Sequence, residues 1–249
     1  MNFPTHYGVK NLEPLPYEKL GYAQHAETGI IETMTDAIKH KTNMFFEIGF
    51  SSGGMNMTRD LFTKGWSGVG VDARYEAPSD KLGPLPKVKF IKCKVEPNNL
   101  LDILQEVDVQ VDFFSLDIDS YDFAIAEKLL SSGWQPKTVC LEFNPKFGPT
   151  AHASFPFRVG KKIFNKKGLY GSSLAKYIAL WTSHGYRYFG FDSTLTNVFF
   201  YHPDTVNDLS HLKIYQPEDL PFTNDDIMLT MIKMHPIWNI EDIWTHSSK

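Results

Sequence analysis

Five short apolar runs recur along the chain, and this repetition is the feature that most limits its fold. The runs occupy residues 44–50, 67–73, 87–93, 111–118 and 137–143. Their aliphatic and aromatic content is nearly continuous, which is typical of parallel strands covered by helices on both faces. Segments between them carry apolar residues at helical spacing, as at Met57, Leu61 and Phe62. The pattern predicts repeated strand–helix–strand units and an α/β fold.

The flanking segments extend this prediction. A helix is expected over residues 26–40, before the first strand, and another after Asp122. Ser172 or Ser173 should cap a further helix that runs through Trp181. The runs 185–191 and 196–202 predict an antiparallel hairpin that closes the sheet edge.

Bulk properties place the chain among globular proteins. It has 249 residues, 42% of them hydrophobic and 22% charged, which suits one domain with a real core. We expect a single domain made of an N-terminal helical segment (1–43), a core (44–202) and a packed extension (203–249). With no long apolar run and no signal-peptide pattern, we expect a cytoplasmic protein without a membrane partner. Cys93 and Cys140 fall in strand-like runs and are expected to be core thiols.

A glycine-bearing turn follows the first predicted strand and precedes a helix. It reads Glu47-x-Gly49-x-x-x-Gly53-Gly54, and glycines there let the backbone approach a ligand closely beside a helix N-terminus. Asp72, 23 residues after Gly49, ends the second predicted strand, where such folds hold a ribose diol. A tight turn and a solvated acid would explain the same residues without a ligand. Together they favour an adenosine-type ligand.

Two classes of enzyme bind such a ligand in such a turn. Nicotinamide enzymes of the short-chain type carry their fingerprint near the chain start and a Tyr-x-x-x-Lys pair. Here about 40 residues precede the turn, and Leu174 and Trp181 stand four residues after Tyr170 and Tyr177. Both observations count against a nicotinamide enzyme, and the resemblance is instead to methyltransferases.

A broader resemblance then becomes visible. The segments NMFFEIGFSSGG, GWSGVGVDAR, VDFFSLDIDSYDF, VCLEFNPKFGP, LYGSSLAKYIAL and TNVFFYH occur in that order between Gln24 and His202. In these segments the chain resembles class I S-adenosylmethionine-dependent methyltransferases, in a bacterial and environmental group related to the FkbM type. The chain departs from many relatives at Ser51-Ser52 and at Ser120.

The resemblance implies a Rossmann-like class I methyltransferase fold. Its mostly parallel seven-stranded sheet would end in an antiparallel hairpin and carry helices on both faces. The implied cofactor is S-adenosylmethionine, and the implied cofactor-binding residues are Glu47, Gly49, Ser51, Gly53, Asp72, Ala73 and Asp117.

Three carboxylates, Asp117, Asp119 and Asp122, close the fourth predicted strand. Clustered acids are costly unless they bind a cation, pair with bases or hold a proton. In one interpretation Asp117 and Asp119, with Glu142 or Asn144, are oxygen ligands for Mg²⁺. In another, Asp117 or Asp119 is a general base without a metal. In a purely structural interpretation Asp122 caps a helix and Asp119 is a turn residue.

The segment after the fifth strand is a long loop without apolar periodicity, which is typical of a lid or binding segment. Asn144-Pro145-Lys146-Phe147 opens it and resembles a signature of amino-group methyltransferases, but it follows the wrong strand, so it is interpreted as a turn. His152 is a candidate base. The loop's basic residues would suit an anionic acceptor or simply form a solvated surface; they are Arg158, Lys161, Lys162, Lys166 and Lys167.

Three functions remain open from the sequence. The first is methyl transfer to oxygen of a small molecule or glycan-type acceptor. The second is an accessory protein that binds the cofactor without transfer. The third is nucleic-acid methylation, suggested by the basic loop, although the net charge of −4 argues against a nucleic-acid partner.

Overall fold

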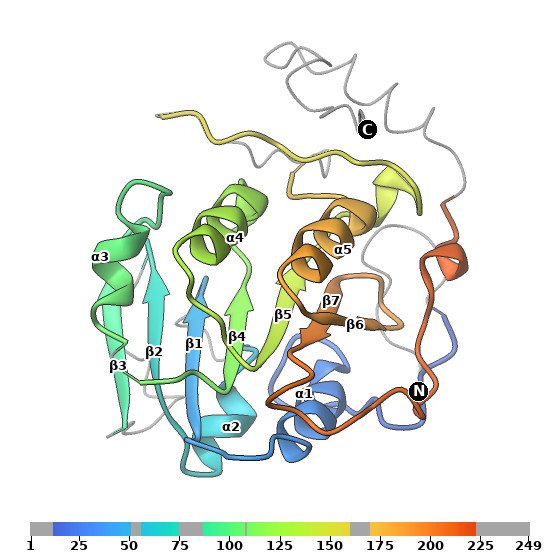
Figure 1. Cartoon of the computed structure of the whole chain (residues 1–249), viewed down its shortest axis with the longest axis horizontal. Helices are drawn as coiled ribbons and strands as arrows, with labels where there is room; N and C mark the ends of the chain where they lie inside the picture. The colour runs from blue at the N-terminus through green and yellow to red at the C-terminus, as the bar shows by residue number, and fades with distance from the viewer. Residues whose placement is uncertain (1–11, 51–55, 75–86, 108, 160–169, 223–249) are drawn as a thin grey trace.

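The computed structural model describes residues 12–50, 56–74, 87–107, 109–159 and 170–222, and these residues form a three-layer α/β/α arrangement (Figure 1). The central layer is a seven-stranded sheet of order β3-β2-β1-β4-β5-β7-β6. Its strands are β1 (Met44–Ile48), β2 (Ser67–Asp72), β3 (Val88–Lys92), β4 (Phe113–Leu116), β5 (Thr138–Glu142), β6 (Arg187–Phe191) and β7 (Asn197–Tyr201).

All strands but one run in the same direction. The pairs β3-β2, β2-β1, β1-β4 and β4-β5 are parallel, whereas β7 is antiparallel to both β5 and β6. The five apolar runs therefore correspond to parallel strands, and the last two predicted runs form an antiparallel hairpin. This confirms the predicted Rossmann-like fold, with its mostly parallel seven-stranded sheet and C-terminal hairpin.

Helices cover both faces of the sheet. One face carries α3 (Leu100–Leu104), α4 (Asp122–Ser131) and α5 (Leu174–Ser183), and the other carries α1 (Glu27–Asp36) and α2 (Arg59–Thr63), as Figure 1 shows. Each face has its own apolar core. The core under α4 and α5 includes fully buried Leu129 and Trp181, and the core under α1 includes Met34 and Phe45. Because both faces are covered, strands β1, β4 and β5 are apolar almost throughout, as the sequence predicted.

The helices differ from the prediction mainly in length. The second helix begins at Arg59 and spans five residues, although the sequence suggested an earlier start. Helix α3, also five residues long, was not predicted. Ser173 is the N-cap of α5, as expected, and its hydroxyl accepts the Lys176 N–H. Asp122 is not an N-cap: it is the first residue of α4 and its carboxylate binds the preceding loop.

The segments outside the core pack onto it where they are described. Residues 203–222 join both cores, through Leu209 on the α1 face and Tyr215 on the α5 face. Two short 3-10 helices, Pro145–Phe147 and Pro217–Asp219, complete the regular structure of the described residues. Within those residues, none of the helices has the length and apolar character needed to span a membrane. The division of the chain into one domain with three parts stays a prediction.

Candidate functional site

Chemistry-bearing residues form one row across the carboxyl edge of the sheet. Asp72 is the last residue of β2 and Glu142 the last residue of β5, where Glu142 pairs with Asn197 of β7. The last registered pairs of the parallel strands are Ile48↔Val71, Ile48↔Leu116 and Leu116↔Leu141. One residue beyond these pairs, Gly49 stands next to Asp72 and Asp117, and Asp117 stands next to Glu142. The row therefore reads Asp72, Gly49, Asp117, Glu142 and Asn197. Strand order reverses between β1 and β4, and open α/β sheets bind ligands at such a switch point.

Gly49 stands at that switch point in a conformation that other residues rarely adopt. Its φ is +96°, and its N–H donates to the Val71 carbonyl at 2.9 Å. A Cβ at this position would lie 1.6 Å from the Asp117 carbonyl oxygen. Glycine is thus required by close packing of β1 against the end of β4. The turn it opens, including Ser51 and Gly53, lies outside the described residues.

Glu47 was expected to contact the cofactor, but in the structure its carboxylate binds groups of the protein itself. Its carboxylate accepts the N–H groups of Met57 (3.1 Å) and Thr58 (3.2 Å), together with the Thr58 hydroxyl. These bonds fix the chain just before α2. Burial raises the pKa of Glu47 to about 7, against the effect of the Thr58 and Met57 hydrogen bonds. A cofactor contact for Glu47 stays a prediction.

Asp72 and Ala73 lie at the tip of β2, beside Gly49. Asp72 is half-buried and Ala73 exposed. One carboxylate oxygen of Asp72 accepts the Arg74 N–H at 2.5 Å, which turns the chain away from the strand. The structure therefore brings together the glycine and the acid that the sequence singled out.

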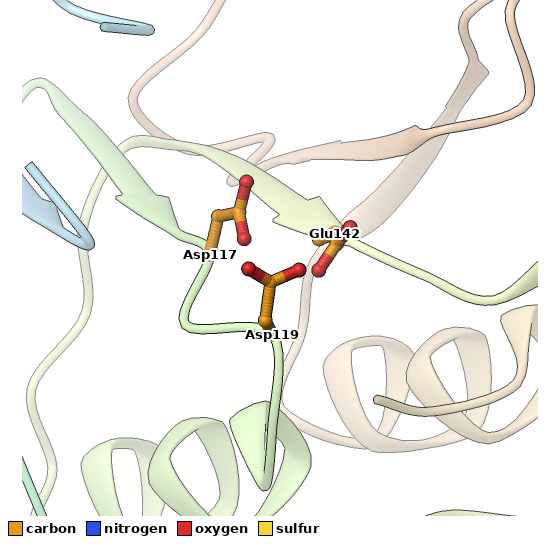
Figure 2. A group of neighbouring side chains, drawn as sticks. All are labelled: Asp117, Asp119 and Glu142. Carbon is orange, nitrogen blue, oxygen red and sulfur yellow. The ribbon is translucent and has the colours of Figure 1, made fainter. Parts of the chain in front are cut away.

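The loop after β4 is organised by Asp122. Its buried carboxylate accepts the N–H of Ile118 (2.8 Å) and the N–H of Ser120 (2.9 Å). Asp119, between them, is exposed and has φ +53°. Asp119 is thus a turn residue, as one interpretation held, but the turn also carries its carboxylate to the sheet edge beside Asp117 (Figure 2).

Glu142 completes a group of three carboxylates with Asp117 and Asp119. One oxygen from each lies within 4.8 Å of the others, and Figure 2 shows the three side chains turned toward one another. Glu142 is 4% exposed, and its Oε1 accepts the Tyr170 hydroxyl at 3.0 Å.

Burial and mutual repulsion raise the pKa values of this group. The surrounding protein desolvates Asp117, and with the charges of Asp119 and Asp122 it raises the pKa of Asp117 to about 7. Burial, then Asp117 and Asp119, raise the pKa of Glu142 well above its usual range. Burial raises the pKa of Asp122 to about 6. A base whose pKa is near neutrality is suited to proton transfer at physiological pH.

Further buried acids, which the sequence did not single out, bind Asn197, the residue that pairs with Glu142. Glu27, the first residue of α1, accepts the Asn197 side-chain N–H at 2.9 Å and the His25 N–H at 2.7 Å. Asp192 accepts the Asn197 N–H at 2.5 Å. Burial, and then its neighbour Asp192, raises the pKa of Glu27. Next to this pair, the Oδ1 atom of Asn197 is buried and has no hydrogen-bond partner in the part of the chain that the structure describes.

Asn56 is another residue that sequence reasoning missed. It lies just before Met57, whose N–H binds Glu47, and it is 1% exposed, yet neither polar atom of its amide has a hydrogen-bond partner among the described residues. Buried amides without partners are rare and call for an explanation, such as a ligand. Its only sequence signal was its position after the glycine turn.

Two other predicted residues have different surroundings. Both polar ends of the Asn144 amide serve the loop itself: Oδ1 accepts the Lys146 N–H and Nδ2 donates to the Tyr170 carbonyl, both at 3.1 Å. His152 is half-buried and does not belong to the carboxylate group. The loop's four lysines, at 161, 162, 166 and 167, lie outside the described residues.

A hollow of about 580 Å³ lies elsewhere, over β6 and the segment 209–216. Its lining includes Tyr188, Phe189 and Lys213 but no carboxylate and no histidine. It therefore lacks the acid–base groups found at the carboxyl edge of the sheet.

Comparisons with known proteins were made for sequence and for structure. Neither family models nor curated protein sequences match this chain. Among solved structures, the DhpI–SAH complex is similar with a TM-score of 0.39 and 14% identity, covering 64% of this chain and 77% of that one. The SAM-bound amino pentose methyltransferase CalS10 from Micromonospora echinaspora gives 0.41 and 11%, covering 74% and 92%. The fibrillarin pre-rRNA processing protein of Methanococcus jannaschii gives 0.42 and 12%, covering 78% and 90%. The fold assignment rests on strand order and register.

Proposed function

We propose that this chain is an S-adenosylmethionine-dependent methyltransferase that transfers the methyl group to oxygen of a small-molecule or glycan-type acceptor. The observation that carries the proposal is the position of Gly49 and Asp72. They lie side by side where strand order reverses, at the carboxyl ends of β1 and β2. This is where folds of this type bind an adenosine-containing ligand.

The residues present fit the cofactor. The half-buried carboxylate of Asp72 would accept hydrogen bonds from the ribose hydroxyls. The unpartnered amide of Asn56 offers a donor and an acceptor for the amino-acid end of the ligand. Glu47 positions the chain between the turn and α2. Once bound, S-adenosylmethionine supplies an electrophilic methyl group on a positively charged sulfur, which the surrounding carboxylates would stabilise.

Asp117 is the proposed general base. It follows β4 directly beside Gly49, and its pKa of about 7 leaves a substantial share of the carboxylate ready to accept a proton at neutral pH. Asp119, exposed on the same loop, would orient the acceptor hydroxyl. The turn residues Ser51 and Gly53, the FkbM-type relationship, the cytoplasmic location and an anionic acceptor remain predictions from the sequence.

Calorimetry with S-adenosylmethionine and S-adenosylhomocysteine tests the proposal. We expect binding of both, and we expect Asp72→Ala to weaken it strongly. Asp36→Ala is the matched control, because Asp36 is an exposed acid at the C-terminal end of α1, before β1 begins. Undetectable binding to the unaltered protein would refute the proposal. Binding without turnover across a broad panel of acceptors would favour the accessory protein, and affinity for RNA that falls steeply with salt would favour the nucleic-acid enzyme.

A further inference from the structure

We propose that Lys176 and Ser154 form a binding site for an oxyanion, namely a phosphate or carboxylate group of the acceptor. The assignment to the acceptor rests on the proposed function, whereas the site itself rests on the two side chains. Lys176 lies in the first turn of α5, and its Nζ donates to the Ser154 Oγ at 2.7 Å. The same Nζ lies 4.3 Å from the centre of the Phe123 ring, at the start of α4.

The observation that points to a ligand is a half-buried ammonium group without an acid beside it. Among the residues that the structure describes, no carboxylate forms an ion pair with Lys176. Burial lowers the pKa of Lys176 to about 8, and the charge of Glu127, exposed on α4, offsets this only in part. By contrast, the buried Lys137 is paired with Asp112 at 2.8 Å. An ammonium group that loses water without gaining an anion destabilises the folded state, and a bound anion would remove this cost.

The two side chains also offer hydrogen-bond donors that an oxyanion would accept. The Lys176 ammonium has three N–H groups and donates one of them to Ser154. Ser154 accepts this bond, and within the described ranges its own O–H has no acceptor. Ser154 is 6% exposed, so bulk water replaces such an acceptor poorly. Because Nζ and Oγ are 2.7 Å apart, one oxyanion can accept from both, and hydrogen bonds to charged groups are the strong ones.

The position of Lys176 on its helix adds a second unfavourable interaction that an anion would offset. Helix α5 spans ten residues, and its first turn is the positive end of the helix dipole. Acidic side chains stabilise this end of a helix and cations destabilise it, yet the first turn of α5 contains Lys176 and no acid. An anion bound to Lys176 would therefore interact favourably with the ammonium group and with the helix end.

Backbone hydrogen bonds hold Ser154 in place beside α5. Ser154 forms an antiparallel bridge with Ser172, and the Ser173 N–H donates to the Ala153 carbonyl at 2.8 Å. In return, the Ala153 N–H donates to the Ser173 hydroxyl at 3.1 Å. The segment that carries the serine is thus fixed to the start of the helix that carries the lysine. A site whose donors are already in position loses little entropy when it binds a ligand.

The site lies beside the acceptor end of the sheet edge. The Asn144 N–H, just after β5, donates at 2.8 Å to the carbonyl of Ser172, which precedes α5. Gly49 of the proposed cofactor site follows β1, and β4 lies between β1 and β5. Two strand spacings separate β1 from β5 by about 10 Å, so an anion near β5 fits the acceptor better than the cofactor. The sequence predicted an anionic acceptor from the loop over 158–167, and Lys176 provides a cation for it within the described chain.

Competitive acetylation of lysines on the full chain, read out by mass spectrometry, tests the proposal. A trace of an acetyl succinimidyl ester is added while inorganic phosphate or acetate replaces chloride at constant ionic strength. We expect both oxyanions to protect Lys176 saturably, because a bound anion shields the amine and favours its unreactive, protonated form. Lys89, exposed and paired with Glu106, is the internal control and should show no saturable protection. Ser154→Ala removes one donor and should weaken the binding about two- to tenfold. The tighter of the two ions identifies the anionic group.

Thermal unfolding gives an independent readout. Phosphate should raise the melting temperature of the unaltered protein and of Lys89→Met more than that of Lys176→Met. Equal shifts in all three proteins, or equal protection of Lys176 and Lys89 from acetylation, would overturn the proposal.

Calorimetry with S-adenosylhomocysteine on the same samples separates this site from the proposed function. Cofactor binding without protection of Lys176 by phosphate or acetate removes only the oxyanion site. Protection of Lys176 without cofactor binding removes the methyltransferase, and with it the assignment of the anion to an acceptor. If S-adenosylhomocysteine itself protects Lys176, the site belongs to the cofactor and the assignment to the acceptor is wrong.

Discussion

Replacing Gly49 with alanine tests whether close packing between β1 and the end of β4 sets the geometry of the switch point. At φ +96° a residue other than glycine costs on the order of 1–3 kcal/mol. An added Cβ would also lie 1.6 Å from the Asp117 carbonyl oxygen, so the strand ends must move apart. That movement would break the hydrogen bond from the Asp117 N–H to the Ile48 carbonyl, now 3.0 Å and worth about 1 kcal/mol. We expect the free energy of unfolding to fall by about 2–4 kcal/mol.

Gly65→Ala is the matched control for this variant. Gly65 has a similar φ of +89°, but a Cβ there would meet no atom within 4 Å. Both variants carry the backbone cost, so their difference isolates the collision. Urea unfolding followed by tryptophan fluorescence should show Gly49→Ala less stable than Gly65→Ala by at least about 1 kcal/mol. Free energies of unfolding that agree within about 0.5 kcal/mol would refute the packing argument.

Two further predictions concern buried charge. Burial raises the pKa of Glu18 from 4.5 to about 7, so the unfolded chain loses this proton first and stability falls as pH rises from 4.5 to 7. Glu18→Gln should remove up to about 3 kcal/mol of that fall, less any solvent screening, in urea unfolding across this range; an unchanged pH profile would contradict it. Lys137→Met leaves the buried charge of Asp112 unpaired and should cost about 3–5 kcal/mol, whereas Lys89→Met, in an exposed pair, should cost less than about 1 kcal/mol by the same assay. Equal losses would refute it.

The sheet was predictable from the sequence because its strands are buried on both faces. Such strands appear as continuous apolar runs, and their boundaries in the structure lie within a few residues of those runs. Helix α3 escaped prediction because its five residues bury only Leu100 and Ile103, too few for a helical period to be visible. Helix α2 is equally short and also buries only two residues, Leu61 and Phe62.

The candidate site was predictable only as far as strand ends locate it. Asp72, Asp117 and Glu142 end or follow strands, so their common edge followed from parallel pairing. The sequence could not show that the Glu47 carboxylate accepts backbone N–H groups just before α2, because this depends on how close the folded chain brings those groups to Glu47. Nor could it single out Asn56, which belongs to no motif and is conspicuous only because its buried amide lacks partners.

The acidic edge of the sheet favours a positively charged ligand. Two ionised carboxylates at 4.8 Å repel each other by on the order of 3 kcal/mol at an effective dielectric constant of about 20, and one oxygen from each of Asp117, Asp119 and Glu142 lies within that distance of the others. Raised pKa values for Asp117 and Glu142 show that the protein relieves part of this repulsion by holding protons. A positively charged ligand relieves it without protons. Binding of the sulfonium cofactor should therefore release protons from this edge, and the number released at neutral pH, compared between the unaltered protein and Glu142→Gln, measures how much of the repulsion the ligand offsets.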